Sequence, residues 1–566
     1  MTERKDYGVR ILSLAPWPVR RRLLYHVQRR LLPRLPPDRR LRTARQWVPL
    51  EPRRRLKPIT DAPALRVRTP AGRLTARRSV QADPAGVRRD NLDRVVDALT
   101  AAGIPWFRIP VTALTCTGVA VDEADRDRAR AAITADAHIE TLNDGRVLRV
   151  SWPVADPAGR LVLGPDYACE IEFWRTRNTT LVGPRPNPVA DVIAADEPEI
   201  TVAEAVFGPF QNATRRYRTR EVFTMVSPDR VAFPIDAVYT WVDSSDPAWR
   251  RRKNQALRDN GWVAAANEQT ANASRYTSRD ELRYSLRSLQ AFAPWIRHVF
   301  LVTDGQTPAW LDTSRGDLTV VSHRVIFGDT GRLPTFNSQA IESRLHRVPG
   351  LAEHFLYLND DVFLGRPVAP ELFFTPGGLT RFFPSGALVG SAARGPGDTP
   401  ADAAGKNNRD VIQGAFGRVL TQKMKHTPHP CRRSVLAELD LRFADRVEQT
   451  AGHQFRHPED IALLSSLQQY YAYLTGRAAP GQIRYLYTDV ADPITPFRLA
   501  RLLHHRDYDT FCLNDTDSDA EAMTEQSAML AEFLPAYLPF PSRWELSRPR
   551  TPAMRTPSAA LSKVGL

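Results

Sequence analysis

The sequence is poor in cysteine. Only four cysteines occur in 566 residues, and they are far apart and follow no metal-ligand spacing: Cys116, Cys169, Cys431 and Cys512. This scarcity excludes a disulfide-rich secreted domain, and the spacing excludes a zinc finger. We therefore expect buried or free thiols in a reducing compartment.

Long apolar runs are also absent. No uninterrupted apolar segment is long enough to span a bilayer, and the N-terminus lacks the apolar core of a secretory signal. These two absences lead us to expect a cytoplasmic protein.

Most of the chain has almost no net charge, although the total is +15. Residues 1–57 hold 17 of the 78 basic and 4 of the 63 acidic residues, which leaves 61 basic and 59 acidic residues elsewhere. The basicity therefore belongs to an N-terminal arm, residues 1–60. No base-reading or stacking module follows this arm, so we expect no nucleic-acid partner.

Residues 17–35 of the arm, WPVRRRLLYHVQRRLLPRL, place leucine and valine at helical spacing between arginines. Such a helix suits the surface of an anionic membrane, so peripheral attachment to the inner face of the membrane is one expectation. An ordinary helix docked on the body fits the same pattern, and Pro33 would end or kink it.

The length predicts more than one domain. An α+β pattern of a helix near 92–102 and strands near 147–154 and 161–174 carries no catalytic constellation. The predicted division is an arm over 1–60, an α+β module over 61–200, a linker over 201–233, a catalytic domain over 234–547 and a disordered tail over 548–566.

The catalytic part alternates strands and helices. The order is strand, helix, strand, strand, helix, strand between residues 235 and 364, which predicts a Rossmann-like α/β sheet. The first helix begins with Ser278 and Glu281 at the spacing of a capping box, so a capping role is the stronger interpretation of Glu281. The second helix, predicted over 337–348, places Glu342 and His346 on one face.

The most informative stretch is EHFLYLNDDVFLG, residues 353–365. A buried strand, Phe355 to Leu358, ends in Asn359-Asp360-Asp361. Ligands of open α/β sheets bind beyond the carboxyl ends of strands, so these acids suit a divalent metal that holds phosphate oxygens. An acidic turn that caps a helix or hairpin is the alternative.

Two later stretches add candidate catalytic groups. KHTPHP places His426 and His429 in an extended, proline-punctuated run, where a general base is plausible. RHPEDIALL places Arg456 and Asp460 at the start of a helix predicted over 458–474, where Arg456 could hold a phosphate. Asn514, in FCLNDTDSD, belongs to an acidic loop or to a helix N-cap.

Together these blocks are similar to a known family. IDAVYTWVD, SRDELRYSLRSLQAFAPWIRHVFLVTDGQTPAWLD, LPTFNSQAIESRLHRVPGLAEHFLYLNDDVFLG and KHTPHP…FRHPEDIALL resemble, in order, the four blocks of the Stealth family. That family includes bacterial capsular and exopolysaccharide phosphotransferases and the catalytic subunit of the lysosomal-enzyme N-acetylglucosamine-1-phosphotransferase. The resemblance covers about residues 234–545 and leaves residues 1–230 unexplained.

The resemblance implies a glycosyltransferase-A-like fold and transfer of a sugar 1-phosphate from a nucleotide-sugar to a sugar hydroxyl of a polysaccharide or other glycan. A nucleoside monophosphate would be released. It assigns Asp360 and Asp361 to Mg²⁺ or Mn²⁺, and His426, Asp361, Glu342 and Arg456 to catalysis. The residues that it implies for substrate binding are Asp236, Trp241, Arg283, Asn359, His429, Asp460 and Asn514.

Two other functions fit parts of the sequence. An ordinary metal-dependent glycosyltransferase would use the same acidic strand end but would release a nucleoside diphosphate. A non-enzymatic scaffold held at a membrane by the basic arm would need residues 1–57 for its function.

Overall fold

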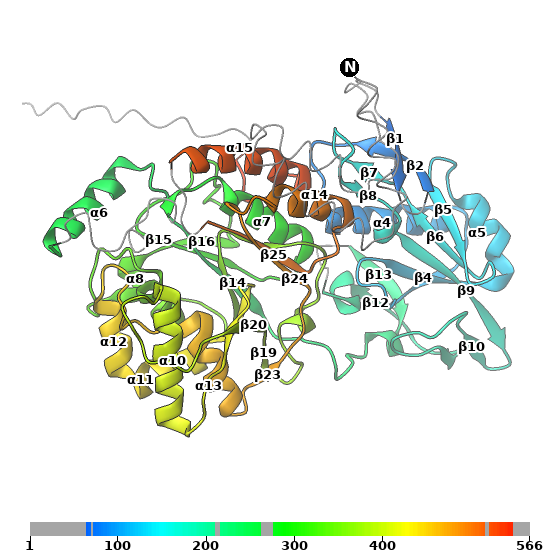
Figure 1. Ribbon diagram of the computed structural model, residues 1–566. Coiled ribbons are helices and arrows are strands. Elements are labelled where there is room, and N and C mark those ends of the chain that lie inside the picture. Colours follow the sequence, from blue (N-terminus) through cyan, green and yellow to red (C-terminus); the bar gives the residue numbers. More distant parts are fainter. Residues whose placement is uncertain (1–63, 70–71, 210–214, 262–275, 516–519, 547–566) are drawn as a thin grey trace, which may run out of the picture.

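The computed structural model describes residues 64–69, 72–209, 215–261, 276–515 and 520–546. An N-terminal α+β module and a larger α/β domain lie side by side (Figure 1). The predicted arm, with its helix over 17–35, and the tail over 548–566 lie outside the described residues.

The larger domain is built on a five-stranded sheet of order β16-β15-β14-β17-β22. The strands are Leu318–Ser322 (β16), Val299–Thr303 (β15), Ile235–Thr240 (β14), His354–Asn359 (β17) and His429–Arg432 (β22). The first four are parallel and β22 is antiparallel. This confirms the predicted Rossmann-like α/β sheet, and its strand order reverses between β14 and β17, where ligands of such sheets bind.

Both faces of this sheet are buried, which explains the continuous apolar run of β17. Leu356 and Leu358 belong to the core on one face, whereas Phe355 and Tyr357 belong to the core on the other. The first core is completed by α7 (Glu281–Phe292), α14 (Thr495–His505) and α15 (Ala520–Tyr537), and the second by α10 (Pro400–Phe416), α11 (Arg433–Arg442), α12 (Ala444–Gly452) and α13 (Gln468–Leu474).

A small second sheet extends the site. β18 (Val362–Leu364) follows the two aspartates directly and pairs antiparallel with β25 (Thr510–Asn514), which in turn pairs parallel with β24 (Tyr485–Asp489). Val362 lies opposite Cys512 in this ladder. Residues about 150 positions apart in sequence are thereby brought beside the carboxyl end of β17.

Two predicted helices are shorter than expected. The helix predicted over 337–348 is α9 (Ser338–Glu342) followed by a 3₁₀ turn, Leu345–Arg347. The helix predicted over 458–474 begins instead with a π-helical turn, Leu463–Leu467, and continues as α13. The Asp460 carboxylate accepts the backbone N–H of His457 at 2.8 Å, which holds residues 457–460 in a turn.

The predicted linker over 201–233 is wrong in its first part. β12 (Glu199–Ala203) and β13 (Arg216–Arg220) pair with each other, and β13 also pairs with β3 (Trp106–Ile109) inside the module. Alternation of polar and apolar residues in RYRTR places Tyr217 and Thr219 in the core. The module therefore extends to about residue 220, within a mixed sheet of nine strands.

The helix predicted near 92–102 is α4 (Pro84–Ala101), which starts earlier because Asp83 caps it and Pro84 occupies its first turn. Its residue Val87 packs with Leu163, Tyr167 and Phe540 in one small apolar cluster. Since Phe540 follows α15 of the larger domain, the two parts share a buried contact.

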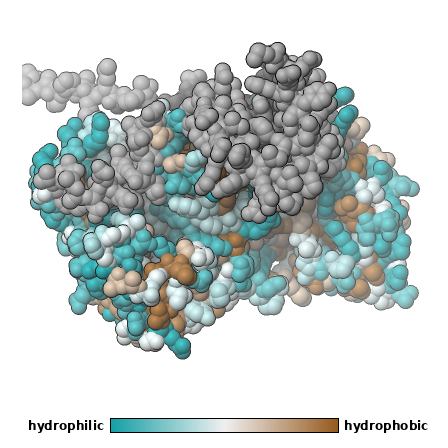
Figure 2. Space-filling view, viewed as in Figure 1, coloured by the Kyte–Doolittle hydropathy of each residue, from teal (hydrophilic) through white to brown (hydrophobic). Residues whose placement is uncertain are grey.

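Hydrophilic residues cover most of the described surface in the space-filling view (Figure 2). None of the helices in the described ranges combines the length and the hydropathy that a bilayer crossing requires.

Candidate active site

A cavity of about 500 Å³ opens at the carboxyl edge of the five-stranded sheet. Trp241, Asp304, His323 and Asp360, which follow β14, β15, β16 and β17, all line it. Nine of the residues predicted from the sequence lie on its wall: Trp241, Glu342, Asn359, Asp360, Asp361, His426, His429, Arg456 and Asn514.

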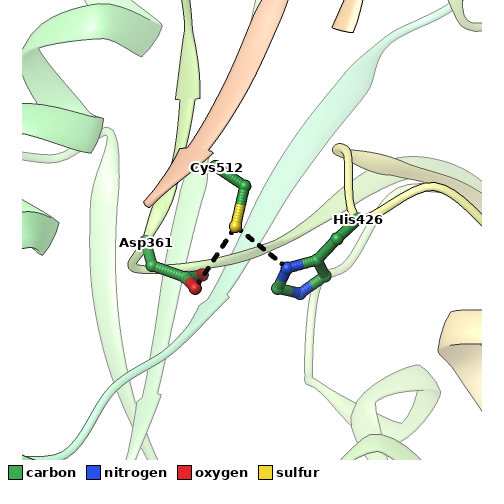
Figure 3. Close-up of side chains that lie close together, drawn as sticks. All are labelled: Asp361, His426 and Cys512. Atoms are coloured by element: carbon green, nitrogen blue, oxygen red, sulfur yellow. Dashed lines mark hydrogen bonds between the residues drawn. The ribbon is translucent and has the colours of Figure 1, made fainter. Parts of the chain in front are cut away.

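Asp361 and His426 are joined through Cys512 (Figure 3). The Cys512 thiol donates a hydrogen bond to Asp361 Oδ2 at 3.4 Å, and His426 Nδ1 lies 3.1 Å from the same sulfur. A carboxylate carries no hydrogen, so the thiol hydrogen points to Asp361. His426 Nε2 lies 3.3 Å from the side-chain oxygen of Asn359.

Burial and the charge of Asp361 raise the pKa of the Cys512 thiol well above its ordinary value. The thiol is therefore protonated at neutral pH, as its hydrogen bond to Asp361 requires. A protonated thiol is a poor metal ligand. Asp361, His426 and Cys512 each offer one possible ligand atom within 4.8 Å of the others, and oxygens are the ligands that a hard cation such as Mg²⁺ prefers.

Two of these oxygens have no protein partner. Asn514 Nδ2 donates to Asp361 Oδ2 at 3.0 Å, but Asp361 Oδ1 and Asn514 Oδ1 are buried and accept no hydrogen bond within the described residues. Buried unpaired oxygens are costly unless a cation or donor completes them. Carboxylate and amide oxygens are ligands for Mg²⁺ or Mn²⁺, so the donor set fits such an ion.

The neighbouring carboxyl groups add to the need for positive charge. Burial, together with the charges of Glu281 and Asp361, raises the pKa of Asp360 well above its ordinary value. Burial raises the pKa of Glu281 to about 7. A cation beside these three acids would favour their ionised forms.

Glu342 and Arg456 lie on another part of the wall. Glu342 is buried and accepts the backbone N–H of Ser465 at 3.2 Å, and burial raises the pKa of its carboxyl group. Arg456 donates to Ser338 Oγ at 2.8 Å. Because residues 457–460 form a turn, Arg456 does not stand at a helix N-terminus as the sequence had indicated.

His429 lies at the start of β22, as the extended run predicts, and is fully enclosed. Its Nδ1 lies 2.9 Å from Gln469 Nε2. Burial lowers the pKa of His429 to about 3, so the ring is neutral. It supports the wall behind His426, with the two ring centroids 6.4 Å apart.

Three residues predicted to bind substrate lie outside the cavity wall. Asp236 stands at the amino end of β14, where it pairs with Arg297 at 2.6 Å and accepts the backbone N–H of Ala352. Arg283 pairs with Glu545 at 2.6 Å. Asp460 holds its own loop together: Asn337 donates to it at 2.8 Å, and His453 contacts it at 2.6 Å.

Several residues of the wall were not predicted to belong to the site. Glu281, interpreted as a capping partner of Ser278, lines the cavity instead and accepts the backbone N–H of Arg279. α7 starts at Glu281 after Asp280, which takes a left-handed conformation and makes no side-chain cap. Other residues that the sequence did not assign to the site include Cys512 and, on the cavity wall, Arg279, His323, Gln339, Lys423 and Lys425.

The chain matches four family models in order. They are Stealth protein conserved region 1 over residues 233–261, region 2 over 275–382, region 3 over 425–473 and region 4 over 500–555. A solved galactosyltransferase, LgtC with donor and acceptor sugar analogs, overlaps 53% of this chain and 95% of its own. Its identity is 11% and the TM-score is 0.29, too low to establish a shared fold.

Curated relatives match across most of the chain. Exopolysaccharide phosphotransferase SCO6023 of Streptomyces coelicolor is 47% identical, over 82% of this chain and 83% of its own length. Exopolysaccharide phosphotransferase CpsY of Mycobacterium tuberculosis is 36% identical, over 72% of this chain and 74% of its own length. The chain therefore belongs to the Stealth family.

Proposed function

We propose that this Stealth protein is a phosphotransferase that moves a sugar 1-phosphate from a nucleotide-sugar to a sugar hydroxyl. The product would be a phosphodiester-linked capsular or exopolysaccharide, and a nucleoside monophosphate would leave. The names of the relatives at up to 47% identity support phosphotransfer in exopolysaccharide synthesis.

One observation carries this proposal: a carboxylate with an unpaired oxygen and an imidazole that can take a proton line the same cavity. Asp361 Oδ1 is buried without a partner in the described chain, and the same carboxylate is linked through Cys512 to His426. Phosphoryl transfer needs a metal-bearing acid beside a group that takes a proton from the attacking hydroxyl. A site for ligand binding alone would need no such base.

A metal ion held by Asp360 and Asp361, with Asn514 as a further oxygen ligand, would supply positive charge to the donor pyrophosphate. Arg456 and Lys425, which line the same cavity, would hold the phosphate oxygens as negative charge shifts toward the leaving group. The buried carboxyl of Glu342 would orient the acceptor hydroxyl. Asp236, Arg283 and Asp460 have no part in this mechanism, because they lie off the wall.

In the transfer one bond to phosphorus forms, one breaks, and one proton moves from the acceptor hydroxyl to His426. The acceptor oxygen forms a bond to the β-phosphorus, and the bond from that phosphorus to the oxygen bridging to the α-phosphate breaks. The electron pair leaves on the nucleoside monophosphate. The hydroxyl proton goes to the imidazole of His426.

The test is to identify the nucleotide released. Purified protein is incubated with Mg²⁺ or Mn²⁺, a glycan acceptor and a panel of nucleotide-sugars, and the nucleotide products are separated. Release of a nucleoside monophosphate together with phosphate in the glycan is the expected result. Release of a nucleoside diphosphate would show an ordinary glycosyltransferase and would overturn the proposal.

A further inference from the structure

His323 and Gln339 are polar residues of the cavity wall that the mechanism does not use. His323 is 4% exposed and Gln339 is 6% exposed. In the described part of the chain neither ring nitrogen of His323 has a hydrogen-bond partner, and neither does Gln339 Oε1. Since an unpaired buried polar atom costs about 1–3 kcal/mol, these groups need partners that the described chain does not supply.

His323 lies far from the two aspartates along the sheet edge. It directly follows β16, which is separated from β17 by β15 and β14. Three strand spacings place the ends of β16 and β17 roughly 14 Å apart. The cavity therefore runs from the aspartates across the ends of β14 and β15 to His323.

Aromatic side chains also line this cavity. Trp249, Tyr276 and Phe336 line the cavity and form one cluster, with the Trp249 ring centroid 5.2 Å from each of the other two. The one acid that follows β15, Asp304, is paired with Arg252 at 2.7 Å. A planar, uncharged group with apolar faces suits this wall.

We propose that His323 and Gln339 bind the edge of the donor's nucleobase, while the pyrophosphate lies at the aspartates. This inference rests on the proposed function and adds a recognition site to it. A nucleobase offers flat faces to the aromatic wall and a row of donors and acceptors along its edge.

The chemistry of the two side chains fits that edge. Burial lowers the pKa of His323 to about 4, so its imidazole is neutral and offers one N–H donor and one bare nitrogen. Gln339 adds a free carbonyl oxygen. Each can accept from a ring N–H or amino group of the base, and His323 can also donate to a carbonyl or ring nitrogen.

The acceptor sugar is the competing occupant of this end of the cavity. Its hydroxyls would also pair with His323 and Gln339, and sugar rings also pack on aromatic side chains. The two occupants differ in what removal of the base does to binding, because an acceptor-site residue would not distinguish a nucleotide from a base-free phosphate.

The experiment compares nucleoside monophosphates with ribose 5-phosphate, which lacks the base. Binding of UMP, CMP, GMP, AMP and ribose 5-phosphate is measured by calorimetry, with Mg²⁺ present, for the wild-type protein and for His323→Phe. We expect the preferred nucleotide to bind about 10-fold or more tighter than ribose 5-phosphate to the wild-type protein. His323→Phe should weaken nucleotide binding by about 10-fold and leave ribose 5-phosphate unchanged.

Two further variants test whether the loss of nucleotide binding is specific to the cavity residues. Gln339→Met should weaken nucleotide binding in the same selective way, and it serves if His323→Phe fails to fold. His298→Phe is the matched control: His298 is partly exposed, contacts Thr319 at 2.9 Å and precedes β15, at the opposite edge of the sheet. It should bind every ligand as the wild-type protein does.

Three outcomes would overturn the inference. Unchanged nucleotide binding by both cavity variants would remove His323 and Gln339 from the base site, with the proposed function intact. An equal loss for nucleotide and ribose 5-phosphate would assign them to the phosphate or ribose. If the wild-type protein binds no nucleotide at all, the inference and the proposed function fail together.

Discussion

Asp361 presents two different oxygens to its surroundings. Oδ2 accepts from the Cys512 thiol and the Asn514 amide, whereas Oδ1 is buried with no partner among the described residues. Asp361→Asn keeps the shape of the side chain but removes its charge. We therefore expect an intact fold with turnover reduced by about 10²-fold or more, the usual scale for a catalytic group.

The metal response is the decisive readout for Asp361. Mg²⁺ or Mn²⁺ should raise the melting temperature of the wild-type protein and should not raise that of Asp361→Asn. Asp410→Asn, a change at an exposed aspartate on α10, is the control and should respond as the wild-type protein does. An Asp361→Asn protein that keeps the full metal response would show that the metal binds elsewhere.

Cys512 connects the base to the acid, so its effect on turnover should depend on hydrogen bonding rather than on size. Cys512→Ala leaves His426 Nδ1 and Asp361 Oδ2 without the sulfur between them. Cys512→Ser restores a group that both donates and accepts. We expect the alanine variant to lower kcat by about 10-fold with little change in KM, and the serine variant to recover most of that loss.

His426→Ala removes the proposed base itself, so its kcat should be lower than that of either Cys512 variant. Loss of the base should lower kcat by about 10²-fold or more, whereas His504→Ala, at an exposed histidine in the last turn of α14, should have no effect. If Cys512→Ala and Cys512→Ser behave alike, the thiol fills space and does not position His426.

Sequence reasoning could find Asp361 and His426 because each stands in a context that a purely structural role explains poorly. Two acids interrupt an apolar strand, and a histidine stands among prolines. It could not find Cys512, because a lone cysteine in an apolar run looks like core. Its role depends on the pairing of β18 with β25, which brings Cys512 to Asp361, 151 positions away in the sequence.

Strands and amphipathic helices were more predictable than the turns between them. Leu282, Leu286 and Leu289 form one buried face of α7, and their helical spacing can be recognised in the sequence. The start of the predicted 458–474 helix was wrong because charge placement near a helix start favours a helix only weakly. The hydrogen bonds of Asp460 to Asn337 and to the backbone of His457 outweigh that preference.

The carboxylate of Glu545, in the chain that follows α15, forms ion pairs with two arginines of α7. Glu545 pairs with Arg283 at 2.6 Å and with Arg287 at 2.7 Å, and it is almost completely buried. Arg283 was predicted to bind substrate, but these contacts give it a structural role. Glu545→Ala would leave two arginines unpaired, one of them nearly buried, and removal of one partner from a buried pair costs about 3–5 kcal/mol.

We therefore expect Glu545→Ala to lower the melting temperature strongly, while KM for the nucleotide-sugar stays unchanged in the protein that remains folded. The control is Glu199→Ala, which removes an exposed partner of Arg218 and should change the melting temperature little. A raised KM in Arg283→Met at unchanged melting temperature would restore the substrate-binding role that the sequence had indicated.

The N-terminal module and the catalytic domain share buried contacts, whereas the basic arm precedes both. Phe540 is buried among Val87, Leu163 and Tyr167 of the module, so removal of the module would expose apolar surface on the catalytic domain. Residues 1–57 include none of the residues proposed for catalysis or metal binding. Turnover on a soluble acceptor should therefore survive this deletion at about the wild-type level, whereas a membrane scaffold would lose its function.

The buried histidines of the cavity make the stability of the whole protein depend on pH. Burial lowers the pKa of His323 to about 4 and that of His429 to about 3. In the unfolded chain both titrate near 6.5, so below that pH the unfolded state takes up protons that the folded state does not. The free energy of unfolding should therefore fall as the pH drops from about 6.5 toward 4, by up to about 3 kcal/mol for His323 alone.

Glu281 acts in the opposite direction. Its pKa is raised to about 7, so between about 4.5 and 7 the folded state holds a proton that the unfolded state has lost, and acidification stabilises the fold through this group. The informative quantity is thus the difference between variants, measured as melting temperature without ligand at about pH 7 and about pH 5. His323→Phe should lose less stability on acidification than the wild-type protein, and Glu281→Gln should lose more. Parallel melting curves for all three proteins would mean that these side chains titrate alike in the folded and unfolded states, which burial against the cavity forbids.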